Sequence, residues 1–587
     1  MKIQNIFVSI ACAAMLTGCS EDFLKNTPQG SLNDGLMNSP AAIDLLVNAA
    51  YAGLSGLTNE QGDPTFRPTS NWWYGEVRAD NAYKGGGGEG DVLNLDQIEK
   101  FENMADNGDM DGKWFNLYSQ ISRCQSALRV LNEATVEDVP ERASRIAEMK
   151  VLRAHFYFEL VRFFNKVPYM DENLPVTEYV NVPNDEFTRD QHLSRIAAEL
   201  LEAAESLPVR QAEVGRINRN IALAYAAKVK LYQAYEQDPQ THAVVNINKT
   251  LLNEVVQLID RVEGCDLLPD FQYLDLVEYD NSVESVFEIQ YSMNDGSDAA
   301  GRINWSNQLC SPGGNSPYGG DGFFVPSQDL INAYQTDENG LPVFDYQSLP
   351  DYAVVEFLDD EHQNLLNTEP NVDPRLDFVV GRPTITWKTW TERPCQSWVR
   401  DRGVYGHNCQ KRFLVSPESS HISFLGCHGL SDLNWRIIRY ADLLLYKAEA
   451  LIELGDLEPA RQLINRVRER AMNSQYVKDF NDPSKYAANY KIGLYPQAGW
   501  TQEYARQALR TEMRLEKALE GERFFDLVRW GIAKEVMTNY LQAEQDNRIY
   551  YKGKTFDAGR EYFPIPVAQY NFSLGRYTQN PGYPAFK

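Results

Sequence analysis

The chain has 587 residues, with 56 basic and 82 acidic side chains and a formal net charge of −26. Nucleic acids and anionic lipid surfaces are bound through basic patches, so this charge balance argues against both as partners. The length is ample for a large core and exceeds that of one small simple domain.

The first residues have the pattern of a bacterial lipoprotein signal. Lys2 precedes an apolar run over residues 6–16, which is too short to span a bilayer as a stable helix. The run ends in Leu16-Thr17-Gly18-Cys19, a lipobox, which predicts cleavage after residue 18 and acylation of Cys19. A plain secretory signal with Cys19 there by chance is the alternative. No later apolar run approaches about 20 residues, so no spanning helix is predicted.

Residues 19–38 are predicted to be a flexible tether. Glu21 and Asp22 come just after Cys19, and residues 27–38 mix proline, glycine and polar side chains without a period. The mature chain would therefore be a folded domain held at a membrane surface through its lipid.

Residues 39–270 are predicted to be mainly helical. Ser39 can cap a helix, and Pro40 fits its first turn. Apolar side chains then recur at helical spacing, which predicts helices over residues 40–57, 114–132, 141–164, 191–207, 218–235 and 248–262. Short polar segments connect these helices, which favours antiparallel packing of neighbouring helices in pairs. Residues 71–91 are an exception, because this stretch is rich in aromatics and ends in four glycines.

Residues 271–430 have a weak helical period and are dominated by glycine, proline, asparagine and aromatics. Short strand-like runs occur, such as residues 285–291. A loop region of this length inside a folded chain is more often functional than idle.

Residues 431–587 are predicted to be a second helical part. Within residues 439–467, Ala448 and Ala460 are twelve positions apart, and Gly455 lies between them. This small-residue spacing is typical of a tetratricopeptide helix pair, in which small side chains let the helices approach and glycine closes the turn. The predicted fold class is all-α: a tetratricopeptide-like scaffold with large loop-rich segments and a few short strands, forming one unit.

Cysteines and metal-binding residue types give weak signals. No CxxC pair occurs, and a disulfide among Cys395, Cys409 and Cys427 is left open. Asp295 and Asp298 could hold Ca²⁺, but the spacing of a calcium loop is incomplete and a plain turn is the preferred interpretation. Four histidines and cysteines are residue types that bind zinc, but their spacing is poor for a zinc site, so a disulfide or burial is the preferred interpretation: His407, Cys409, Cys427 and His428. No cofactor is predicted.

Several blocks together resemble the SusD/RagB family of nutrient-uptake lipoproteins. Beside the lipobox they are WRIIRYADLLLYKAEA at 435–450, INRVRERA at 464–471, EKALEGERFFDLVRWG at 516–531, DPRLD at 373–377, YFPIP at 562–566 and NPGY at 580–583. The acids after Cys19 resemble the export signal of surface lipoproteins in Bacteroidetes-type bacteria. The charged side chains near Gly521 have spacings suited to ion pairs, so we expect a structural role for them: Arg514, Glu516, Glu520, Glu522 and Arg523.

The resemblance implies a fold of tetratricopeptide-like helix pairs beside loop-rich segments, and no enzymatic activity. It implies a surface protein of the outer membrane that captures an oligosaccharide and closes as a lid over a SusC-type TonB-dependent transporter. Some family members bind peptides or other nutrients, so that ligand class is an alternative. Two further function classes compete with this one: a glycoside hydrolase, and a helical-repeat adaptor that binds only protein. For a hydrolase, no carboxylate pair or nucleophile motif can be singled out.

A glycan site needs flat aromatics for the C–H faces of the sugar and polar groups for its hydroxyls, on loops held by a rigid scaffold. Three segments fit, around residues 71–81, 304–318 and 387–401. The candidate ligand-binding residues are Trp72, Trp73, Asp80, Asn81, Trp305, Tyr318, Trp387, Trp390, Trp398 and Arg400, of which Arg400 is a weaker candidate, as is Tyr405. Each tryptophan could instead pack in the core, and Asp80-Asn81 could instead cap a turn. Trp114, Trp435 and Trp530 lie in helical patterns and are expected in the core.

Overall fold

The computed structural model describes residues 39–56, 64–296, 302–352, 368–387, 396–425 and 428–587. The helix-rich architecture with a few short strands is confirmed over these residues. Cys19 and the tether lie outside them. Within this part of the chain, no helix has the length and apolar character needed to cross a bilayer.

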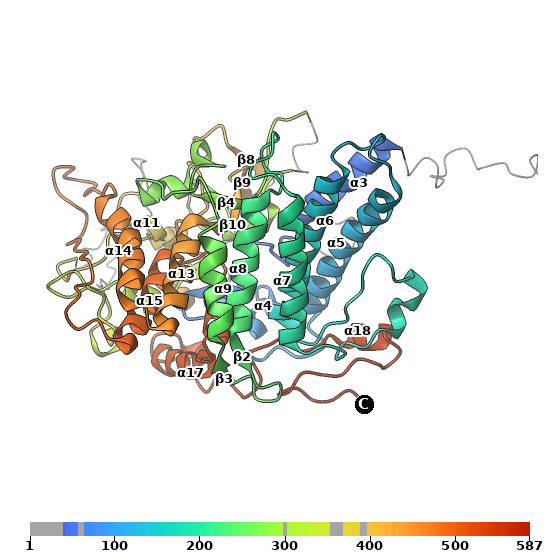
Figure 1. The fold of residues 1–587 in the computed structure, drawn as a ribbon. Coiled ribbons are helices and arrows are strands. Elements are labelled where there is room, and N and C mark those ends of the chain that lie inside the picture. The colour runs from blue at the N-terminus through green and yellow to red at the C-terminus, as the bar shows by residue number, and fades with distance from the viewer. Residues whose placement is uncertain (1–38, 57–63, 297–301, 353–367, 388–395, 426–427) are drawn as a thin grey trace, which may run out of the picture.

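Long helices form one curved layer in which each helix packs on the next (Figure 1). In order they are α5 (Gly108–Glu133), α6 (Arg142–Phe164), α7 (Arg189–Ser206), α8 (Arg219–Ala234), α9 (Lys249–Ile259), α13 (Tyr440–Leu454), α14 (Leu457–Asn473) and α15 (Gln502–Glu516). Helix α3 (Pro40–Ala52) packs on α5. The chain leaves this layer after α9 and returns to it at α13, so the loop-rich residues between them are one long excursion from a helical scaffold.

Local sequence explains where these helices begin and end. The Ser39 hydroxyl accepts a hydrogen bond from the Ala42 amide at 3.3 Å, and Thr188 with Gln191 forms a capping box at the start of α7. Gly455 ends α13 with a φ of +97°, a conformation that glycine adopts without steric cost. Ala448 and Ala460, on the two helices that meet at this turn, are fully buried.

Strands occur only as antiparallel pairs among the described residues. The pair that joins the excursion to the scaffold is β4 (Ser285–Ile289) with β10 (Trp435–Arg439), in which Trp435 lies opposite Ile289. The others are β1 (Ala82–Gly85) with β5 (Phe323–Pro326), β2 (Tyr235–Gln237) with β3 (Val244–Ile247), β6 (Val380–Gly381) with β7 (Cys409–Gln410) and β8 (Ile422–Leu425) with β9 (His428–Ser431).

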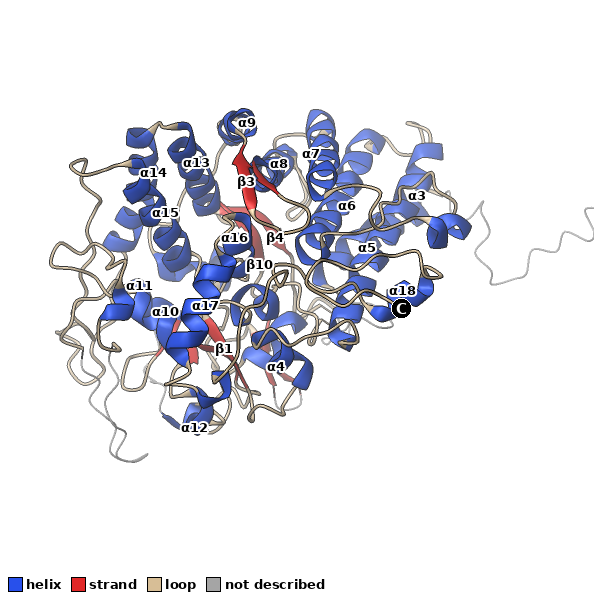
Figure 2. Ribbon diagram, turned by 90° about the horizontal axis from the view of Figure 1, so that it is seen from below, coloured by secondary structure: helices blue, strands red, loops and turns tan. Residues whose placement is uncertain are grey.

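Shorter helices fill the space beside the layer (Figure 2). They are α4 (Leu93–Glu99), α10 (Gln328–Ala333), α11 (Arg375–Val379), α12 (Arg402–Tyr405), α16 (Arg523–Arg529), α17 (Ala533–Glu544) and α18 (Val567–Phe572).

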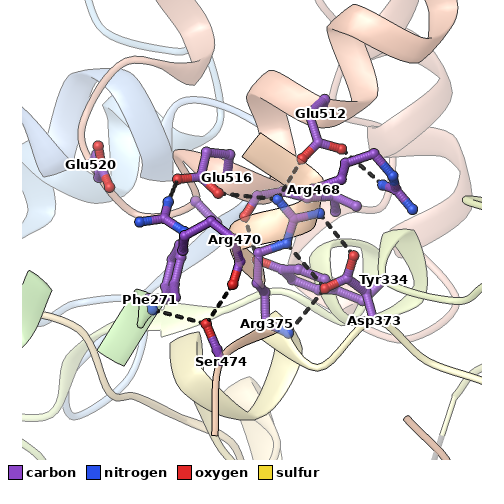
Figure 3. Close-up of polar contacts among 12 residues, drawn as sticks. Phe271, Tyr334, Asp373, Arg375, Arg468, Arg470, Ser474, Glu512, Glu516 and Glu520 are labelled. Atoms are coloured by element: carbon purple, nitrogen blue, oxygen red, sulfur yellow. Dashed lines mark hydrogen bonds and ion pairs between the residues drawn. The ribbon is translucent and has the colours of Figure 1, made fainter. Parts of the chain in front are cut away.

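A buried network of ion pairs fastens the excursion to the helical layer (Figure 3). Glu516 on α15 accepts hydrogen bonds from Arg375 at 3.1 Å, from Arg439 at 2.7 Å and from Arg470. Arg375 also pairs with Asp373 at 2.8 Å, and neither side chain is exposed. The predicted structural role of Glu516 is confirmed, but its partners come from distant segments rather than from the neighbouring turn.

The other charged residues near Gly521 also pair over long range. Glu520 accepts from Arg412 and Arg439, and Glu522 from Arg162 and Lys228, at 2.9–3.2 Å. Because a buried carboxylate without its cationic partners is costly, these pairs restrict how the segments can pack.

Candidate functional site

The first predicted ligand loop, residues 71–81, lies in the core. Trp72 and Trp73 have no exposed surface, and the Trp72 ring packs on Phe324 with 5.1 Å between centroids. A sugar ring needs an open aromatic face, so the prediction that these two tryptophans contact ligand is wrong for this structure. The backbone of Trp72–Val77 forms a π-helix that lies against the turn at Gly521.

Asp80 and Asn81 are committed to buried partners. Arg523 donates two hydrogen bonds to the Asp80 carboxylate at 2.8 Å, and Arg514 lies 3.3 Å from it. Asn81 accepts from Arg514 at 2.8 Å and donates to Glu76 at 2.8 Å. Burial raises the pKa of Asp80, but the two guanidiniums more than offset this and bring it below its ordinary value. The pair joins the 71–81 loop to α15 and α16 rather than presenting groups to sugar hydroxyls at an open surface.

Glu76 is a buried carboxyl group that the sequence did not single out. It accepts backbone N–H groups from Gly521 at 2.8 Å and Glu522 at 3.1 Å, and burial raises its pKa to about 7. The approach is so close that a Cβ on Gly75 would lie 1.9 Å from the Gly521 carbonyl oxygen. Gly75 and Gly521 permit this close backbone contact, and they are the only sequence signal that the 71–81 loop packs against the turn at Gly521.

The second and third predicted segments meet in a buried aromatic cluster. The Trp387 indole donates to the Tyr318 hydroxyl at 3.0 Å, Tyr318 donates to the Val415 carbonyl at 2.8 Å, and Trp398 packs on Trp387 with 5.2 Å between centroids. Tyr318, Trp387 and Trp398 are at most 5% exposed. Their predicted contact with ligand is therefore wrong for this structure, because all three side chains are buried.

Arg400 reaches the surface, and with Asp91 and Asp321 it forms what we call the Arg400 cluster. Its guanidinium lies 3.3 Å from the Asp91 carboxylate and donates to the Asp321 carbonyl at 2.9 Å. The exposed fractions of the three side chains are 37%, 34% and 25%. A guanidinium and two carboxylates at an open surface can donate to and accept from sugar hydroxyls.

Glycines explain how Arg400 fits between its loops. A Cβ on Gly87 would lie 2.9 Å from the Arg400 guanidinium, and one on Gly313 would lie 2.5 Å from its side-chain stem. The Lys84 ammonium group donates a 2.7 Å hydrogen bond to the Gly88 carbonyl and so anchors the loop that contains Gly87. The glycine-rich stretches of both loops thus shape the surface by letting a long side chain lie against bare backbone.

Of the predicted stacking residues that the structure describes, Trp305 remains partly accessible. It is half-buried and begins the 3-10 helix Trp305–Cys310. This helix is held from inside, because the Trp72 indole donates to the Ser306 carbonyl at 3.1 Å. Phe66 and Phe424 are exposed aromatics, at 36% and 50%, that the sequence did not single out because neither lies in a tryptophan-rich loop.

An amide-lined groove of about 320 Å³ lies between residues 209–218, residues 263–265 and β4. Asn281 and Gln290 on its wall exchange two hydrogen bonds between their side-chain amides, at 2.9 and 3.0 Å. Amides both donate and accept, which suits hydroxyl-rich ligands. No sequence pattern predicted this groove, since its amides come from separate joints between helices.

The remaining candidates are placed as follows. Tyr405 is buried, at 1% exposure, which argues against contact with ligand. Asp295 accepts from Ser292 at 2.5 Å and lies 3.3 Å from Arg302, and the described part of the chain holds no group of three or more metal-ligating side chains. Outside the described residues lie Trp390, Asp298, Cys395 and Cys427, so calcium binding and the disulfide stay predictions.

The chain belongs to the SusD family. The model of that family matches residues 283–583, and a second model, described as "Starch-binding associating with outer membrane", matches residues 22–231.

The chain is similar to known proteins along nearly its whole length. SusD-like protein P2 of Formosa agariphila is 25% identical, over 97% of both chains. A SusD-like protein from Bacteroides fragilis has the same fold, with a TM-score of 0.68, 19% identity and coverage of 94% of this chain and 99% of that one. Surface glycan-binding protein A from Bacteroides thetaiotaomicron, solved in complex with laminarihexaose, has a TM-score of 0.61 at 21% identity and covers 92% of this chain and 99% of its own.

Proposed function

We propose that this chain is a cell-surface lipoprotein that binds an oligosaccharide and acts as the lid of a SusC-type TonB-dependent transporter. It captures the ligand without cleaving it and releases it inward when the lid closes. Cys19 carries the lipid, and residues 19–38 allow the domain to swing on its transporter.

One observation carries the glycan part of the proposal. The chain shares its fold, over 92% of its length, with a surface glycan-binding protein solved in complex with laminarihexaose. Two features of the described surface suit a sugar best. The Arg400 cluster offers charged hydrogen-bonding groups, and the half-buried Trp305 offers an aromatic side chain.

Calorimetry with the soluble domain tests glycan binding. Laminarihexaose is the first probe, followed by a glycan array if it does not bind. For a glycan that binds, we expect Trp305→Ala to weaken affinity by about 1–2 kcal/mol, as loss of one aromatic platform would. Arg400→Gln should weaken it by a similar amount, since it removes a charged hydrogen-bond donor.

Arg466→Gln is the matched control, because Arg466 is similarly exposed, at 43%, and pairs with Asp266, which does not belong to the Arg400 cluster. Binding that is unchanged in both Trp305→Ala and Arg400→Gln would rule out Trp305 and the Arg400 cluster as parts of the glycan site. Shortened oligosaccharides in the incubation mixture would instead favour a hydrolase, and binding of peptides but no glycan would favour a peptide-binding member of the family.

Membrane attachment and the transporter need separate measurements. A tagged full-length chain should co-purify with a β-barrel transporter from detergent-solubilised outer membranes. Cys19→Ala should abolish palmitate labelling and release the protein from the membrane fraction. If the protein is labelled with palmitate but no barrel transporter co-purifies with it, the assignment as a lipoprotein holds and the proposed role as a transporter lid is refuted.

A further inference from the structure

A cavity of about 170 Å³ lies where α15, α16 and α17 meet α10 and residues 346–347. Figure 2 shows α16 and α17 next to one another beside α10. The cavity is lined by none of the residues of the Arg400 cluster or of the amide groove. Gln347 and Asn539 at its rim are exposed, so it opens to solvent.

Three arginines and two aspartates line the cavity, which leaves one positive charge in excess in a chain whose net charge is −26. Arg514 pairs with Asp329 at 2.7 Å, and Arg523 donates both of its bonds to Asp80 at 2.8 Å. These two guanidiniums are therefore neutralised within the protein. The excess charge belongs to Arg510.

Arg510 is held in place by packing, and within the described part of the chain it has no acidic partner. It is one turn before Arg514 on α15, so the two side chains share a face of the helix. Its guanidinium lies 5.4 Å from the centre of the Trp530 ring, and no carboxylate of the described chain lies within ion-pairing distance of it. Packing on tryptophan limits the motion of the side chain, so less freedom is lost when an anion binds.

We propose that this cavity binds a small anion, a carboxylate or a sulfate group, through the guanidinium of Arg510. The planar fork of a guanidinium matches the oxygens of both groups. The Thr511 hydroxyl and the Asn539 amide line the cavity and supply further donors. Ile532 and Val536 form an apolar wall that suits the carbon skeleton of an organic acid.

Calorimetry on the soluble domain at fixed ionic strength tests the proposal, with sodium sulfate, sodium galacturonate and neutral galactose as probes. We expect saturable binding of at least one anion and none of galactose; which anion binds distinguishes sulfate from carboxylate. Arg510→Gln should weaken that binding at least about tenfold, because it removes charge-assisted hydrogen bonds. Thr511→Val should weaken it less.

Arg506→Gln is the control, since Arg506 is on the same helix and already pairs with Glu453 at 2.7 Å. Its affinity should equal that of the unaltered protein. Equal losses in Arg506→Gln and Arg510→Gln, equal binding of galactose and galacturonate, or no saturable binding of either anion would overturn the proposal. Anion binding in this cavity does not depend on the glycan site, so Trp305→Ala should leave it unchanged.

Discussion

Glu516→Gln is the sharpest test of the buried ion network. This substitution keeps the size of the side chain and removes one negative charge that faces Arg375, Arg439 and Arg470. Burial raises the pKa of Glu516, but the three guanidiniums bring it below its ordinary value, so the group is ionised at neutral pH.

The size of the effect follows from the geometry. At about 4 Å between charge centres and an effective dielectric constant of about 20, each pair contributes roughly 4 kcal/mol, or about 12 kcal/mol for three pairs. The cost of removing the carboxylate from water offsets most of this, which leaves a net loss of about 3–5 kcal/mol in the free energy of unfolding. An unfolding entropy of about 2.1 cal/mol/K per residue over 587 residues is roughly 1.2 kcal/mol/K, so Tm should fall by about 2.5–4 °C.

Differential scanning calorimetry at pH 7 measures the change. Glu503→Gln is the matched control: it lies on the same helix, its side chain is 73% exposed, and its only ion pair among the described residues is the 3.5 Å contact with Arg506. We expect this control to shift stability by less than about 0.5 kcal/mol. If Glu516→Gln costs no more than Glu503→Gln, the assignment of the network as the fastening between the loop-rich segment and the helical layer is refuted.

Three further predictions concern buried groups. Burial raises the pKa of Glu99 from 4.5 to about 7, so between these pH values the folded protein holds a proton that the unfolded chain has lost. The free energy of unfolding should therefore fall by up to about 3 kcal/mol as the pH rises through this range. Urea titrations of Glu99→Gln should lack this part of the pH dependence. Gly75→Ala should prevent stable folding, because its Cβ would lie 1.9 Å from a backbone oxygen, whereas Gly90→Ala meets nothing within 4 Å; equal melting temperatures for the two variants would contradict this. Trp72→Phe removes the hydrogen bond to the Ser306 carbonyl and should cost about 1–3 kcal/mol in chemical denaturation, an expectation that unchanged stability would disprove.

Most of the helical scaffold could be predicted from the sequence. The predicted helices of residues 114–132 and 141–164 correspond to α5 and α6, and the turn at Gly455 lies where the spacing of Ala448 and Ala460 placed it. These features are local, since helical periodicity and caps depend on residues three or four positions apart. The strand β4 was also predicted, but its partner β10 was not, because strand pairing is not local.

The candidate site was predicted much less well. A tryptophan in a glycine-rich loop has the same sequence signature whether it faces solvent or the core. Trp387 is buried, whereas Trp305 stays partly accessible, and only packing decides between these outcomes. The same holds for Asp80, whose arginine partners lie more than 430 residues further along the chain.

The sequence by itself determined the predicted export signal, the helix-pair scaffold and the family, because each of these depends on residues that are close together in the chain. The tertiary structure decided which side chains reach the surface. Arg400 is exposed because Gly87 and Gly313 let it lie over their backbones. Arg510 has no acidic partner among the described residues, because Asp80 and Asp329 pair with other arginines. Exposure and charge balance depend on contacts between distant segments, and a pattern read along one chain does not contain them.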